Sequence, residues 1–144
     1  DSTIYYSPDY RSFVQNHRSS LNSLAAALIS RGDSARAREV LIYSIEKMPD
    51  HGVRYDYTNT QTVEYLLAVG EKERALEMAN ILATRSDELA TYYIKERVYG
   101  RDLQIPIVIL GQLQRVMFEY GETELAEKIE AMYNKHYAAF RQLR

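Results

Sequence analysis

The chain has no cysteine or tryptophan, and it has few glycines and prolines. Its 144 residues include 6 Gly and 3 Pro. Without cysteine there is no disulfide, no thiol nucleophile and no thiolate ligand for a metal. The missing cysteines do not distinguish a reducing compartment from an oxidising one. A chain of this length fits a single domain with a hydrophobic core.

An excess of charge of one sign is also missing, and so is a long hydrophobic run. The formal net charge is -2, and acidic and basic residues are intermixed. No basic stripe is present that could follow a phosphate backbone, so we expect no nucleic-acid partner. Even the longest apolar runs, such as Ile105–Leu110 with its Pro106, are far shorter than the ~20 residues that span a bilayer. We therefore expect no direct membrane insertion. Because the first residue is Asp1 rather than methionine, we expect a piece of a longer protein.

Apolar residues recur at three- and four-residue steps along most of the chain, which is the period of an amphipathic α-helix. The pattern is interrupted at glycines, where we expect tight turns between antiparallel helices. No segment is convincing as a strand, and Ile4–Tyr6 is too short to build a sheet. The sequence therefore predicts an all-α fold, a stack of three antiparallel helical hairpins. The expected parts are a lead-in over 1–14, hairpins over 15–49, 59–85 and 102–140, and an extra short helix within 86–100.

The three predicted turns form an internal repeat. Each turn glycine is followed by an alanine five residues later and is preceded by a large apolar residue four residues earlier. Glycine permits the left-handed turn conformation, alanine lets the second helix cross close to the first, and the large residue fills the space between them. The glycines are Gly32, Gly70 and Gly121, the alanines are Ala37, Ala75 and Ala126, and the large residues are Leu28, Leu66 and Met117.

This repeat resembles the tetratricopeptide repeat over about residues 18–49, 57–87 and 108–137. Stacked hairpins of that kind curve and leave a concave groove lined by the first helix of each pair. A groove of this family would hold an extended peptide, a lipid-linked glycan or the membrane domain of the same protein. The resemblance implies that the groove positions are Asn22, Tyr57, Glu64 and Arg115.

A second resemblance covers the whole chain. The order of its segments is similar to the soluble C-terminal region of large bacterial membrane proteins related to protein O-mannosyltransferases. In that family a multi-span, glycosyltransferase-like membrane domain precedes this region, so no catalytic residue of the family falls within it. The residues that carry the resemblance are Ile4–Tyr6, Arg18, Leu24, Ala25, Leu28, Gly32 to Ala37, Met48–Asp50, Tyr55–Tyr57, Gly70, Glu71, Ala75, Asp102, Tyr120, Gly121 and Leu125–Ile129.

The residues needed for common chemistries do not occur in the required patterns. The chain has no nucleophile elbow, no glycine-rich phosphate loop and no paired acid and base. The histidines His17, His51 and His136 are scattered and have no partner at metal-ligand spacing on a helix. We therefore expect no catalytic residue, no metal site and no cofactor, and no enzymatic activity of this chain by itself.

Tyrosine is the one unusually abundant residue, with 13 in the chain. Its ring offers contact area at a low entropic cost and ends in a polar group, which suits binding surfaces. Four of the tyrosines, Tyr43, Tyr65, Tyr133 and Tyr137, fall in helical stretches and are expected to line the core or the seams between hairpins. Tyr55 and Tyr57, in the irregular segment between the first two hairpins, either pack under that segment or form the lip of a binding site.

Three functions remain open. The first is a non-catalytic binding or scaffolding module of a glycosyltransferase-like membrane protein, with a protein, peptide or glycan as partner. The second is an accessory part of the transferase active site, which would contact sugar through Tyr55 and Tyr57. The third is a purely structural or dimerisation domain. By the resemblance, the chain is a soluble domain tethered to the bacterial inner membrane, on the periplasmic face.

Overall fold

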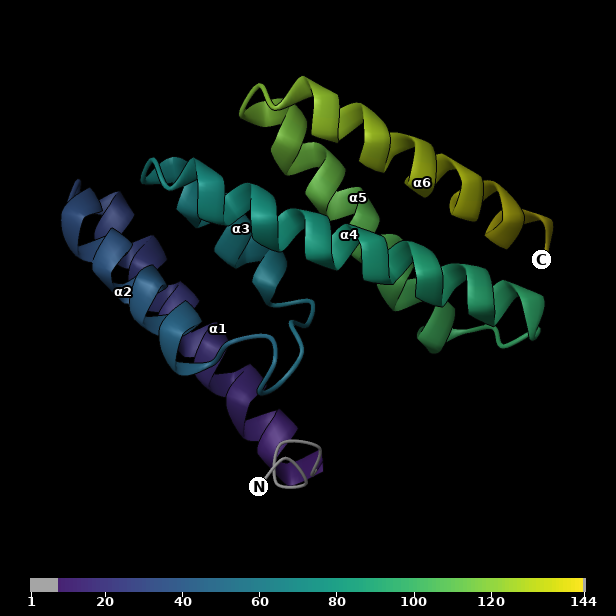
Figure 1. Cartoon of the computed structure of the whole chain (residues 1–144), viewed down its shortest axis with the longest axis horizontal. Helices are drawn as coiled ribbons and strands as arrows, with labels where there is room; N and C mark the ends of the chain where they lie inside the picture. The colour runs from purple at the N-terminus through teal and green to yellow at the C-terminus, as the bar shows by residue number, and fades with distance from the viewer. Residues whose placement is uncertain (1–7, 144) are drawn as a thin grey trace. The chain divides into compact units, whose positions relative to one another are not determined.

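A computed structural model describes residues 8–143, and this range contains helices and no strand. The prediction of an all-α fold is confirmed, whereas the tetratricopeptide-like arrangement stays a prediction. Ile4–Tyr6 and the rest of the first half of the predicted lead-in, residues 1–7, lie outside the described residues. The six helices of the described range (Figure 1) are α1 (Pro8–Ser30), α2 (Ser34–Lys47), α3 (Asn59–Ala68), α4 (Lys72–Lys95), α5 (Arg101–Glu119) and α6 (Thr123–Gln142).

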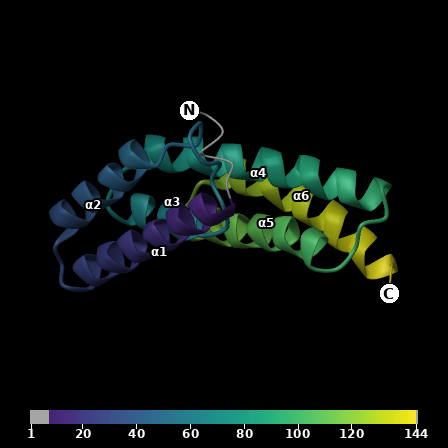
Figure 2. The ribbon, with the colours of Figure 1, turned by 90° about the horizontal axis from the view of Figure 1, so that it is seen from below.

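The chain divides into two compact units, Asp1–Ala75 and Leu76–Arg144, where the sequence predicts one domain. In the first unit, α3 packs against both α1 and α2. In the second unit, α5 and α6 pack against each other and lie side by side in both views of the ribbon (Figures 1 and 2). Each unit therefore contains one complete helical hairpin, α1–α2 or α5–α6.

The first helix begins earlier than predicted, at Pro8 rather than after residue 14. Proline is well tolerated at the first helical position because its missing N–H would have no partner there. The added turns are held by packing, since Val14 is buried against Met48 and Val53 and the half-buried Tyr10 covers the same cluster. Contacts distant in sequence therefore extend the helix beyond the point at which its apolar period becomes clear.

The three predicted turn glycines adopt the left-handed conformation, with φ of 80° at Gly32, 84° at Gly70 and 75° at Gly121. In each turn the residue after the glycine donates its N–H to the carbonyl of the large apolar residue four positions before the glycine, which is the Schellman arrangement. The N···O distances are 2.9 Å for Asp33 to Leu28, 2.8 Å for Glu71 to Leu66 and 2.8 Å for Glu122 to Met117. The three repeat alanines, Ala37, Ala75 and Ala126, are fully buried.

The extra short helix predicted within 86–100 is wrong, because α4 continues without a break through Lys95. Ser86, whose short oxygen-bearing side chain is typical of a helix start, is buried in the middle of α4. Leu82, Ser86 and Ala90 recur every four residues as one buried face, and no glycine or proline interrupts the segment. Helix α4 ends at Lys95, two residues before Arg97, the one described non-glycine residue with positive φ, at 59°.

Candidate functional site

Asn22 does not lie in an open groove, contrary to the prediction, because its side chain is fully buried. Its Nδ2 donates to the carbonyl oxygen of Thr58 at 2.9 Å, and its Oδ1 accepts from the hydroxyl of Thr62 at 3.0 Å. These bonds join α1 to α3 and to the residue that precedes α3. Both polar ends of the amide are used within the fold, so Asn22 is a structural residue.

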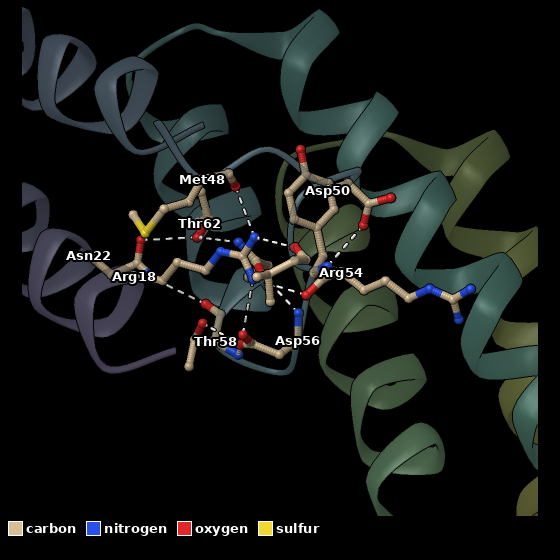
Figure 3. A network of polar contacts seen from close by, with 11 residues as sticks. Arg18, Asn22, Met48, Asp50, Arg54, Asp56, Thr58 and Thr62 are labelled. Carbon is tan, nitrogen blue, oxygen red and sulfur yellow. Dashed lines mark hydrogen bonds and ion pairs between the residues drawn. The ribbon is translucent and has the colours of Figure 1, made fainter. Parts of the chain in front are cut away.

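The most extensive polar network of the first unit centres on Arg18, one turn before Asn22 on α1 (Figure 3). The Arg18 side chain is fully buried, and it faces the segment 48–58, hereafter the connector. Its Nη2 donates to the carbonyl oxygens of Met48 at 2.8 Å and Val53 at 2.7 Å. Its Nη1 donates to the carbonyl of Arg54 at 2.9 Å and to Oδ2 of Asp56 at 3.2 Å.

This arrangement satisfies a buried charge that would otherwise be costly. A guanidinium taken out of water needs both a counter-charge and partners for its N–H groups. Asp56 supplies the negative charge, and three backbone carbonyls of the connector supply acceptors. In return, the Arg18 guanidinium supplies hydrogen-bond donors to connector carbonyls that lie outside the helices. Arg18 therefore holds the connector in one conformation against α1.

Asp56 extends the network toward α3. Its Oδ1 accepts from the N–H of Thr58 at 2.8 Å and also from the Thr58 hydroxyl. Its own N–H donates to Oδ1 of Asn59 at 2.9 Å. These short-range bonds form the kind of turn by which an aspartate begins a helix. A single carboxylate thus neutralises Arg18 and shapes the entry to α3.

The two connector tyrosines have different environments. Tyr55 is half-buried, and the guanidinium carbon of Arg18 lies 5.4 Å from its ring centroid, so it packs under the connector. Tyr57 is 54% exposed and remains available for contact. Glu64, the third predicted groove residue of this unit, is half-buried on α3. The structure therefore leaves Tyr57 as the most exposed of the candidates in the first unit.

The second unit contains a groove between α5 and α6 of about 490 Å³, hereafter the α5–α6 groove. Arg115, the remaining predicted site residue, lines it and forms an ion pair with Glu119 at 2.9 Å. The apolar part of the lining includes Ile107, Val108 and Phe140. Arg115 is thus at a real concavity, although the other predicted groove residues belong to the first unit.

One wall of the groove is built from stacked side chains on α6. The rings of Tyr133 and Tyr137 are nearly parallel, with centroids 5.5 Å apart, and the guanidinium of Arg141 lies 5.8 Å from the Tyr137 centroid. Gly111 on α5 admits this wall, because a Cβ there would lie 3.1 Å from Cε2 of Tyr133. Tyr133 and Arg141 thus lie close to the Tyr137 ring, which leaves less of its face open to a bound molecule.

One residue of the groove lining, Gln114, has a buried polar atom without a partner. Its Oε1 accepts no hydrogen bond from any residue between 8 and 143. A buried acceptor without a donor is destabilising by about 1–3 kcal/mol. Because Oε1 is closed to solvent, it adds no accessible acceptor to the groove surface.

A second polar cluster joins α4 to α6 in the same unit. Oδ1 of Asp87 lies 2.6 Å from Nε2 of the buried His136 and 3.0 Å from Nζ of Lys135. Burial of the Asp87 carboxyl favours its neutral form, but the hydrogen bonds from His136 and Lys135 outweigh this effect and lower the pKa of Asp87 below its ordinary value. The sequence gives no signal for this contact, since the partners are far apart in the chain.

No family model, curated protein or solved structure was found to match this chain. None of the helices within residues 8–143 is both long enough and apolar enough to cross a bilayer. Among those same residues, no three His, Asp or Glu side chains are grouped in a way that could hold a metal ion. The candidate sites are the exposed Tyr57 of the connector and the α5–α6 groove.

Proposed function

We propose that this chain is a non-catalytic interaction module and that the α5–α6 groove is its contact surface. The observation that supports the proposal most directly is the concavity of about 490 Å³ between α5 and α6, whose apolar lining includes Ile107, Val108 and Phe140. A partner that covers this lining would remove its apolar surface from water.

The shape of the lining favours a protein partner over a sugar. A pyranose ring packs against the face of an aromatic ring, but Tyr133 and Arg141 leave less of the Tyr137 face open. The groove also offers aliphatic groups and amides, which suit the side chains of a helix or an extended peptide. Tyrosine and arginine are also the residue types that contribute most often to protein interfaces.

We place this module in a longer membrane protein. The resemblance to the C-terminal region of membrane proteins related to protein O-mannosyltransferases supports a tether at the bacterial inner membrane, with the module on the periplasmic face. In this account any glycosyl transfer occurs in the membrane domain, and the module binds a protein segment that the transferase needs nearby.

The experiment compares two tyrosines of similar exposure in the longer protein. Tyr137 is 40% exposed in the groove, and Tyr99 is 43% exposed outside its lining. Tyr137→Glu should impair the function of the longer protein without lowering the melting temperature of the module by more than the control Tyr99→Glu does. Equal function of both variants would contradict the proposal.

A second candidate function is supported by Tyr57. This side chain is exposed on a connector that the Arg18 network holds in place, which is the rigidity a sugar-contacting residue needs. The module would then complete the active site of the transferase. Tyr57→Ala should in that case impair transfer in the longer protein, whereas Tyr137→Glu should not.

A further inference from the structure

The internal repeat allows corresponding positions to be compared around all three turn glycines, and the second hairpin here means the segment around Gly70. We define the leading face of a hairpin by two positions, which lie twelve and eight residues before its turn glycine. In the second and third hairpins these positions are buried, as Thr58 and Thr62 and as Ile109 and Leu113. In the first hairpin they are Ser20, which is exposed, and Leu24, which is 47% exposed. The leading face is therefore open only in the first hairpin.

The surface on the opposite side of the hairpins is buried in the first hairpin and open in the third. The trailing face of a hairpin is defined by the position ten residues before the glycine and the positions twelve and sixteen residues after it. In the first hairpin these are Asn22, Ser44 and Met48, all buried. The third hairpin has Gly111, Tyr133 and Tyr137 at these positions, and all three line the α5–α6 groove. The trailing face of the third hairpin is therefore open.

The first unit shows how two such faces meet. Helix α3 packs against α1 and α2, and its leading-face residues Thr58 and Thr62 form hydrogen bonds to the trailing-face residue Asn22. A leading face thus covers the trailing face of the preceding hairpin. The chain carries one uncovered face of each type, on its first and its third hairpin.

We propose that these two faces bind each other between copies of this chain, so that the leading face of α1 in one copy occupies the α5–α6 groove of a second copy. This inference rests on the proposed function and names the partner of the groove. Leu24 supplies an apolar side chain for the apolar lining of the groove, and the exposed Ser20 lies one turn before it on the same face of α1. The contact joins different surfaces, so it is heterologous and leads to rings or to open chains.

The test uses sedimentation velocity on the 144-residue chain from about 1 µM to about 1 mM, a range that covers weak interfaces. We expect reversible association that proceeds beyond a dimer. Leu24→Glu and Tyr137→Glu should each weaken association by at least about tenfold, because each places a charge in a buried apolar contact. Leu89→Glu, at a leucine that is 45% exposed, and Tyr99→Glu are the matched controls and should associate like the parent chain.

Mixing the two blocked variants gives the sharpest result. Leu24→Glu retains an intact groove and Tyr137→Glu retains an intact leading face, so together they should form a one-to-one dimer and nothing larger. Circular dichroism should show that both variants fold. If either does not, Ala27→Glu on the exposed side of α1 and Val108→Glu in the groove replace them.

A chain that stays monomeric over this range overturns the inference, and so does association that neither variant weakens. An isologous dimer that stops at two copies also overturns it. Each of these results leaves the proposed function intact if Tyr137→Glu still impairs the longer protein, because the groove would then bind a different molecule.

Discussion

Arg18 on α1 donates from Nη1 to Oδ2 of Asp56 at 3.2 Å, and the same guanidinium donates to three carbonyls of the connector. The arginine is fully buried, while the side chain of its carboxylate partner is 24% exposed. This pair holds the long connector between the first hairpin and α3, and it explains why a segment without helical period has a defined conformation.

Replacing Arg18 should strongly destabilise the chain. Arg18→Met removes the counter-charge of Asp56 and leaves the connector carbonyls without their donor, which we expect to cost about 3–5 kcal/mol. Urea unfolding measures the change, with Arg54→Met as the control because Arg54 is exposed and contributes only its backbone carbonyl to the network. The control should stay within about 0.5 kcal/mol of the parent. Similar midpoints for both variants would show that the network is dispensable.

Asn22 and Tyr57 should behave differently although the sequence suggests the same role for both. Asn22→Ala leaves the Thr58 carbonyl without its buried donor and should lower the free energy of unfolding by about 1–3 kcal/mol. Tyr57→Ala should change it by less than about 0.5 kcal/mol, since that side chain is mostly exposed. Thermal and urea unfolding of the two variants measure this. A stable Asn22→Ala variant would mean that the α1–α3 bonds are weak.

Gly121 and Arg97 both have positive φ near a helix end, but we expect their replacement to change stability in opposite directions. Gly121→Ala should destabilise the chain by about 1 kcal/mol through backbone strain alone, because the space around its Cβ is open. Arg97→Gly should stabilise it by up to about 1 kcal/mol, since arginine holds φ of 59° there. Chemical denaturation of both variants measures the changes. A loss of stability in Arg97→Gly would indicate that the arginine side chain contributes more than the strain costs.

Stability at acid pH should depend on Asp87. Its pKa is lowered in the folded chain, so the stability it contributes is fully present above its unfolded pKa of about 3.9. That contribution is lost as the pH falls through the lower, folded pKa. The parent should therefore be more stable than Asp87→Asn at neutral pH, and the difference should shrink below about pH 4. Unfolding measured from pH 7 down to pH 3 tests this. A difference that does not change with pH would contradict the assignment.

The turns could be predicted because their determinants are local. A glycine, an alanine five residues later and a large apolar residue four residues earlier are visible in the sequence, and the structure uses each of them. Ser86 and Asp87 misled the prediction because they look like a helix start. Their actual roles depend on burial and on His136, which lies 49 positions away from Asp87.

The polar interior could not be predicted from local pattern. Arg18 and Asn22 lie on the same face of α1 as the buried Val14 and Ala25, but their side chains are of types that usually face solvent. Their hydrogen-bond partners come from the connector and α3, which no local pattern on α1 reveals. The α5–α6 groove was missed for a related reason. Tyr133 and Tyr137 have the spacing of core residues, and their stacking beside Gly111 becomes apparent only when α5 and α6 are packed.

Site-specific photo-cross-linking in the longer membrane protein proposed above, in its native cells, shows whether the α5–α6 groove is an interaction surface. A photoreactive amino acid replaces Tyr137 in the groove and, in a second strain, the similarly exposed Tyr99. The account predicts a discrete protein adduct from position 137, identified by mass spectrometry, and none from position 99. If both positions give the same adducts, or if position 137 gives none, the α5–α6 groove is not an interaction surface.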